Sequence, residues 1–91
     1  MEYEKQTIAI LEDDERLRAQ LITLLTKRGY LVLGAPSPEQ LDEVLALEKP
    51  KRLALLILDM DVPGGRTGAE YGRELVSRSE YRASPPASLI Y

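Results

Sequence analysis

The sequence predicts an α/β fold in which helices cover both faces of a doubly wound parallel sheet, giving three layers. Apolar runs of strand length alternate with segments of helical periodicity, in the order β-α-β-α-β-α-β. The run "LALLIL" at residues 53–58 is apolar at every position, which is typical of a parallel strand covered on both faces. Acidic residues follow two of the expected strands, at the edge where ligands bind in such sheets.

The first strand is expected at Thr7 to Leu11, "TIAIL", a short apolar run that ends in acidic residues. Leucines then recur at helical spacing through "ERLRAQLITLLTKRG", which predicts the first helix. Lys27 and Arg28 fall in its last turn, where cations complement the helix dipole. Gly29 can supply the left-handed residue that ends it.

The run "YLVL" at residues 30–33 predicts the second strand. Ser37 can cap a second helix, Pro38 suits its first position, Gln40 can close a capping box, and Pro50 ends it. The third strand follows at 53–58. A third helix is expected at 69–78, although Gly72 weakens its pattern, and "PPASLIY" begins a fourth strand.

The composition indicates one small globular domain, residues 1–91. The chain has no cysteine and no histidine, which excludes disulfides, thiolate catalysis, a histidine base and histidine or cysteine metal ligands. Any chemistry must therefore use carboxylates, hydroxyls, lysines, arginines or the backbone.

The formal net charge of −3 argues against direct binding to nucleic acid, which usually needs a clustered basic face. No segment approaches the roughly 20 apolar residues of a membrane helix, so no membrane association is expected. The polar N-terminal segment "MEYEKQTIAI" is unlike a secretion signal, and we expect a cytoplasmic location.

Two acidic clusters, Glu12 to Glu15 and Asp59 with Asp61, follow the first and third strands. If these strands are neighbours, the clusters converge at the carboxyl edge of the sheet. Repulsion among carboxylates there would favour a bound divalent cation, and oxygen ligands suit Mg²⁺. A carboxylate beside Mg²⁺ can act as the nucleophile toward a phosphoryl group.

Each cluster also has a plainer interpretation. Asp13, Asp14 and Glu15 could cap the first helix and complement its dipole. Asp59 and Asp61 could be turn formers ahead of the Pro-Gly-Gly sequence that follows them. The occurrence of both clusters after apolar strands favours a metal site.

The sequence resembles a response-regulator receiver domain, the phospho-acceptor module of two-component signalling. The resemblance rests on "AILEDDERLRAQL", where an acidic pair follows the first strand, and on "LLILDMDVPGG", where Asp59 ends the third strand and Pro63 follows four residues later. It covers essentially the whole chain. It implies a flavodoxin-like sheet with strand order 2-1-3-4-5, here truncated after the fourth strand, so that the last strand and the last two helices are absent.

The resemblance implies that Glu12 and Asp13 form the acidic pair and that Asp59 is the phosphorylated residue. Asp61 stands where the family completes the shell of Mg²⁺ with a backbone carbonyl, and Asp14 is a helix-start residue. The implied partners are a histidine kinase or a phosphotransfer protein, together with an output domain or partner protein that reads the phosphorylated state. The implied role is a phosphoprotein in a phosphorelay and not an enzyme.

Two departures from the family pattern are expected to matter. The family usually places glycine four residues after the loop proline, where Thr67 stands, and Gly68 comes one residue later, as after a one-residue insertion. The family also carries a Ser or Thr after the fourth strand and a Lys after the fifth, which we expect to lie beyond Tyr91. Phosphorylation is therefore expected to be impaired. An exposed fourth strand would favour a homo-oligomer or a domain swap.

Two alternatives remain open at this stage. The chain could be a receiver-like interaction module that is not phosphorylated. It could also be a fragment of a haloacid-dehalogenase-like phosphatase, whose strand followed by Asp-x-Asp resembles "LLILDMDV", with Asp59 as nucleophile and Asp61 as acid and base.

Overall fold

The computed structural model describes residues 5–62 and 65–91. Pro63 and Gly64, part of the expected turn, lie outside the described residues. The elements in chain order are β1 (Thr7–Leu11), α1 (Glu15–Lys27), β2 (Leu31–Ala35), α2 (Pro38–Glu48), β3 (Leu53–Leu58), α3 (Gly68–Val76), α4 (Ser79–Arg82) and β4 (Ala87–Ile90).

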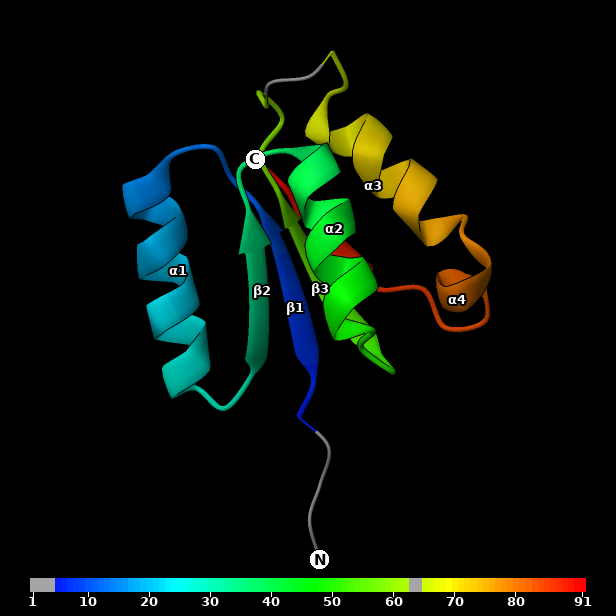
Figure 1. Ribbon diagram of the computed structural model, residues 1–91, viewed down its shortest axis with the longest axis horizontal. Helices are drawn as coiled ribbons and strands as arrows, with labels where there is room; N and C mark the ends of the chain where they lie inside the picture. Colours follow the sequence, from blue (N-terminus) through cyan, green and yellow to red (C-terminus); the bar gives the residue numbers. More distant parts are fainter. Residues whose placement is uncertain (1–4, 63–64) are drawn as a thin grey trace, which may run out of the picture.

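The described strands form one parallel sheet of four strands in the order β2-β1-β3-β4. The predicted α/β fold is therefore confirmed, and the order agrees with the first four strands of the receiver pattern. Because all strands run in the same direction, their carboxyl ends share one edge, and the C-terminus lies at that edge (Figure 1).

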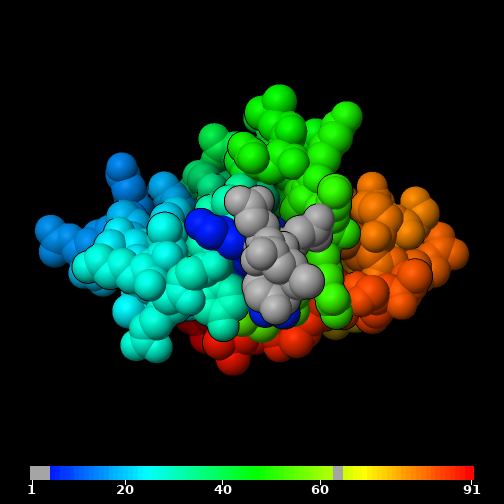
Figure 2. Space-filling view, turned by 90° about the horizontal axis from the view of Figure 1, so that it is seen from below, coloured from blue at the N-terminus to red at the C-terminus, as the bar shows by residue number. Residues whose placement is uncertain are grey.

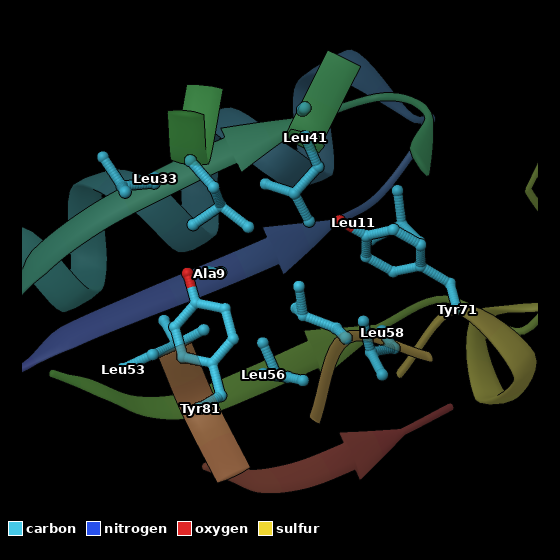
Figure 3. Packing of buried hydrophobic residues seen from close by; sticks show 12 residues of the cluster. Ala9, Leu11, Leu33, Leu41, Leu53, Leu56, Leu58, Tyr71 and Tyr81 are labelled. Carbon is cyan, nitrogen blue, oxygen red and sulfur yellow. The ribbon is translucent and has the colours of Figure 1, made fainter. Parts of the chain in front are cut away.

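Helices cover both faces of the sheet, as the apolar third strand predicted. Figure 1 shows α1 on one side of the strands and α2, α3 and α4 on the other. On the α1 side, Ile8, Ile10 and Ile57 form a small buried cluster. The larger cluster lies on the opposite side, where leucines of β1, β3 and α2 pack with Tyr71 and Tyr81 (Figure 3).

Side-chain caps fix where the three longer helices begin. Asp14 accepts from the amide of Leu17 at the start of α1, and Ser37 caps α2 as predicted. At α3, Thr67 and Glu70 form a reciprocal capping box, in which each side chain accepts from the other residue's amide. This cap explains why α3 begins one residue before the predicted helix. It ends at Val76, and the separate short helix α4 follows.

A network around Tyr71 joins α3 to α2. The Tyr71 ring is fully buried, and its hydroxyl donates to Asp42 Oδ1 over 2.7 Å. Arg78 pairs with the same carboxylate oxygen over 2.9 Å, and the Arg66 and Arg78 guanidinium carbons lie 5.3 and 5.9 Å from the ring centroid. Burial works against the charged form of Asp42, but hydrogen bonds from Arg78 and Tyr71 outweigh it and lower the pKa of the carboxyl.

The strand β4 lies at the margin of the described sheet and is exposed along its whole length. Leu89 is 55% exposed and Ile90 43%. Seen from below, the red atoms of the C-terminal segment lie at the surface, on the opposite side from the green atoms of α2 (Figure 2). The expectation that the fourth strand is exposed is therefore confirmed.

Candidate functional site

The sheet positions the acidic residues through backbone bonds that continue beyond the strand ends. The amide of Glu12 donates to the carbonyl of Ala35 over 3.1 Å, and the amide of Asp59 donates to the carbonyl of Leu11 over 2.9 Å. Because β1 and β3 pair directly, with Leu11 level with Leu58, the next residues on each strand stand side by side.

The carboxylates of Glu12, Asp13 and Asp59 meet at this edge. Each offers an oxygen that lies within 4.8 Å of the oxygens offered by the other two. Glu12 is almost completely buried, with 2% of its surface exposed, whereas Asp59 is partly buried and Asp13 is exposed. The expected convergence of the two acidic clusters is confirmed, and the roles of the residues remain proposals.

Both carboxylate oxygens of Glu12 accept hydrogen bonds from within the chain. The Tyr91 hydroxyl donates to Oε1, and the Asp14 amide donates to Oε2 over 2.9 Å. Burial on its own raises the pKa of Glu12, but these bonds outweigh burial and lower the pKa below its usual value. Glu12 is therefore held as a carboxylate.

At Asp59, in contrast, the surroundings raise the pKa of the carboxyl above its usual value. Burial is the main cause that raises the pKa of Asp59, and the neighbouring charges of Glu12 and Asp13 raise it further. The amide of Asp61 donates to Asp59 Oδ1 over 3.0 Å, which opposes the rise without cancelling it. The ionised form of Asp59 is therefore destabilised by its surroundings in the absence of a cation.

Two acidic residues that the sequence singled out stand outside this group. Asp14 is the N-cap of α1, as predicted. The side chain of Asp61 is exposed, and among the described residues it does not join the group of converging carboxylates. The link between Asp61 and the site is its backbone amide, bonded to Asp59.

Gly68 packs closely against the backbone carbonyl of Asp59. A Cβ at Gly68 would lie 2.1 Å from the carbonyl oxygen of Asp59 and 2.8 Å from its carbonyl carbon, so only glycine fits. The amide of Gly68 donates to the carbonyl of Met60 over 3.2 Å. Although Thr67 takes the position where the family has glycine, Gly68 makes the close contact and Thr67 caps the helix.

The sequence reasoning missed Tyr91. We expected the hydroxyl residue that follows the fourth strand to lie beyond the given chain. The structure corrects this, because β4 ends at Ile90 and Tyr91 is the residue that directly follows. A tyrosine therefore stands in the place where a Ser or Thr was expected, with its hydroxyl on Glu12.

The residues at this edge fit a divalent cation of the Mg²⁺ type. They supply oxygen atoms from three carboxylates, which are the donors that hard cations prefer. Burial is the main cause of the raised pKa of Asp59, and the charges of Glu12 and Asp13 add to it; a cation would relieve that repulsion.

The sequence matches no family model. Among solved structures, the chain is similar to a sensor protein from Polaromonas sp. JS666, with 26% identity and a TM-score of 0.75, over 96% of this chain and 65% of that one. It is also similar to the non-phosphorylated HemR receiver domain from Leptospira biflexa, with 25% identity and a TM-score of 0.73, over 94% of this chain and 64% of that one.

A third similar structure is the N-terminal domain of a response regulator receiver protein from Methanoculleus marisnigri JR1. It has 25% identity and a TM-score of 0.71, and the match covers 92% of this chain and 63% of that one. The chain thus spans less than two thirds of the length of each of the three structures. The strand order, the two-sided helix cover and these neighbours agree, and the chain has the receiver fold of response regulators.

Proposed function

We propose that the chain is the phospho-acceptor receiver domain of a two-component response regulator. In this proposal Asp59 takes a phosphoryl group from a histidine kinase or a phosphotransfer protein in a Mg²⁺-dependent reaction. The observation that carries the proposal is the convergence of Glu12, Asp13 and Asp59 at the carboxyl edge of a receiver fold.

The residues proposed to hold Mg²⁺ are Glu12, Asp13 and Asp59, together with the backbone carbonyl of Asp61. When bound, Mg²⁺ supplies positive charge that offsets the repulsion of the carboxylates and the charge of the phosphoryl group.

The chain's own contribution is a carboxylate held in a fixed position. Asp59 Oδ1 accepts from the Asp61 amide, and the Asp59 backbone is fixed by Leu11 and by its contact with Gly68. In the transfer, a bond forms between an Asp59 oxygen and phosphorus while the bond from phosphorus to the donor breaks, and the donor leaves with its electron pair. Because the aspartyl-phosphate is the product, the chain is proposed to act as a stoichiometric acceptor and not as an enzyme.

A small phosphodonor tests this proposal. We expect intact mass measurements to show the gain of one phosphoryl group per chain with phosphoramidate and Mg²⁺, and no gain when a chelator removes the cation. An Asp61→Asn variant should still be labelled, because the Asp61 side chain is exposed and outside the carboxylate group.

The same experiment separates the alternatives. Absence of labelling at any Mg²⁺ concentration, with no effect of Mg²⁺ on melting, would favour a receiver-like interaction module. Continuous release of inorganic phosphate that depends on the Asp61 side chain would favour the phosphatase reading.

Self-association through β4 is also proposed. The strand exposes Leu89 and Ile90 at the margin of the described sheet, and such edges can pair with a second chain. We expect light scattering to give a mass above that of one chain, and Leu89→Lys to lower it. A well-folded monomer at concentrations of about 100 µM would contradict this prediction.

An output domain or partner protein that reads the phosphorylated state, and a cytoplasmic location, remain predictions. Within residues 5–62 and 65–91, no helix is both long and apolar enough to cross a membrane.

A further inference from the structure

Tyr91 is fixed beside Asp59 by the sheet. Its amide donates to the carbonyl of Leu58 over 3.0 Å, and its carbonyl accepts from the amide of Met60 over 2.8 Å. Since Leu58 is level with Ile90 and with Leu11, the next residues Tyr91, Asp59 and Glu12 form one row across three strands. Level residues of a parallel sheet point to the same face, so the Tyr91 ring is directed toward the carboxylates.

The Tyr91 hydroxyl is bonded to the most buried of these carboxylates. It donates to Oε1 of Glu12, whose other oxygen accepts from the Asp14 amide. An ionised carboxylate can only accept, so the Tyr91 phenol is the donor in this bond. A cation that used Glu12 Oε1 would have to displace this hydroxyl.

Displacement is sterically feasible from the side of Tyr91, which is 47% exposed, whereas Glu12 at the other end of the hydrogen bond is buried. The bond also reduces the cost of leaving Glu12 charged without a cation. The hydroxyl and a cation therefore compete for one buried carboxylate.

We propose that the Tyr91 hydroxyl is a built-in competitor of the metal, which occupies Glu12 in the metal-free chain and is released when a divalent cation binds. This inference rests on the proposed function, since it concerns the same cation site. The competition lowers the affinity for Mg²⁺, because a cation that uses Glu12 Oε1 must first break the Tyr91–Glu12 bond.

Calorimetric titration with MgCl₂ tests the competition. Tyr91→Phe keeps the ring and removes the hydroxyl, so we expect it to bind Mg²⁺ about tenfold more tightly than the unmodified chain, the value of one hydrogen bond to a charged group. Tyr71→Phe is the matched control. It also removes a tyrosine hydroxyl that donates to a carboxylate, but that carboxylate is Asp42, which lies outside the site. The Mg²⁺ affinity of the Tyr71→Phe protein should therefore equal that of the unmodified chain.

Carbon-13 labelling of the tyrosine rings adds a direct readout. The Tyr91 resonance, assigned by its loss in Tyr91→Phe, should move when Mg²⁺ is added, while the Tyr71 resonance stays in place. Equal or weaker Mg²⁺ binding by Tyr91→Phe, or a Tyr91 resonance that does not move while the cation binds, would overturn the competition.

The outcomes separate this inference from the proposed function. If the unmodified chain and Tyr91→Phe bind Mg²⁺ equally, and adding Asp13→Asn weakens binding in both, the metal site stands and the competition is wrong. If neither protein binds Mg²⁺, the metal site itself is wrong and the competition falls with it.

Discussion

Replacing Gly68 with alanine is expected to destabilise the chain by roughly 2–3 kcal/mol, as for other substitutions that overfill a packed site. The added Cβ would lie 2.1 Å from the carbonyl oxygen of Asp59, and a backbone atom between two paired segments cannot easily move away. Because small domains have only about 5–15 kcal/mol of stability, this loss should be large in urea unfolding. The Gly68→Ala protein that remains folded should also be labelled more slowly, because the clash displaces Asp59.

Gly72→Ala in the same helix is the matched control. Its Cβ would lie 2.6 Å from Leu58 Cδ1, which is the end of a flexible side chain and can rotate. Alanine also gains about 1 kcal/mol over glycine in a helix, which offsets the crowding. We expect the free energy of unfolding of Gly72→Ala to stay within about 1 kcal/mol of that of the unmodified chain. Equal losses in the two variants would show that the contact between Gly68 and Asp59 is not the constraint.

Replacing Asp59 with asparagine should reduce phosphoryl labelling to background while making the metal-free fold slightly more stable. Asparagine keeps an Oδ1 that can accept from the Asp61 amide but removes the charge that Glu12 and Asp13 repel. Since Asp59 is only partly buried, we expect a gain below about 1 kcal/mol, measured by thermal melting in a chelator near neutral pH.

The pH dependence of that gain follows from the direction of the pKa shift. The pKa of Asp59 is higher in the folded chain than in the unfolded chain. At any pH above the pKa of the folded chain, the ionised carboxylate therefore lowers the free energy of unfolding. As the pH falls from the pKa of the folded chain toward the ordinary pKa of aspartate, Asp59 becomes protonated. The difference in stability between the unmodified chain and Asp59→Asn should then disappear. A difference that stays constant down to acidic pH, or labelling that persists in Asp59→Asn, would contradict the account.

The acidic residues at the strand ends can be predicted from patterns that are local in the chain, such as the apolar run before Asp59 and the acidic run after β1. The strand order comes from the resemblance to receiver domains. Once the strands are parallel and β1 and β3 are adjacent, Glu12 and Asp59 must lie close together. The capping role of Asp14 is equally local, because it depends on an amide three residues away.

Tyr91 and Gly68 could not be placed in the same way. The contact of Tyr91 with Glu12 joins residues 79 positions apart and depends on the register of β4 against β3, which an apolar pattern does not determine. Gly68 stands one residue later than the family pattern has glycine, and its role depends on how α3 approaches the backbone of Asp59. The capping box at Thr67 has a local signal, since Thr67 and Glu70 have the required spacing.

The central claim is that Asp59 is the phospho-acceptor, and mapping the modified residue tests it most directly. Reduction of an aspartyl-phosphate with borohydride converts that aspartate to homoserine, which peptide mass spectrometry can locate. After treatment with phosphoramidate and Mg²⁺, we expect homoserine at Asp59 and unmodified aspartate at Asp13, Asp14 and Asp61. Homoserine at one of those other positions, or at none in a chain shown to be folded and bound to Mg²⁺, would contradict the account.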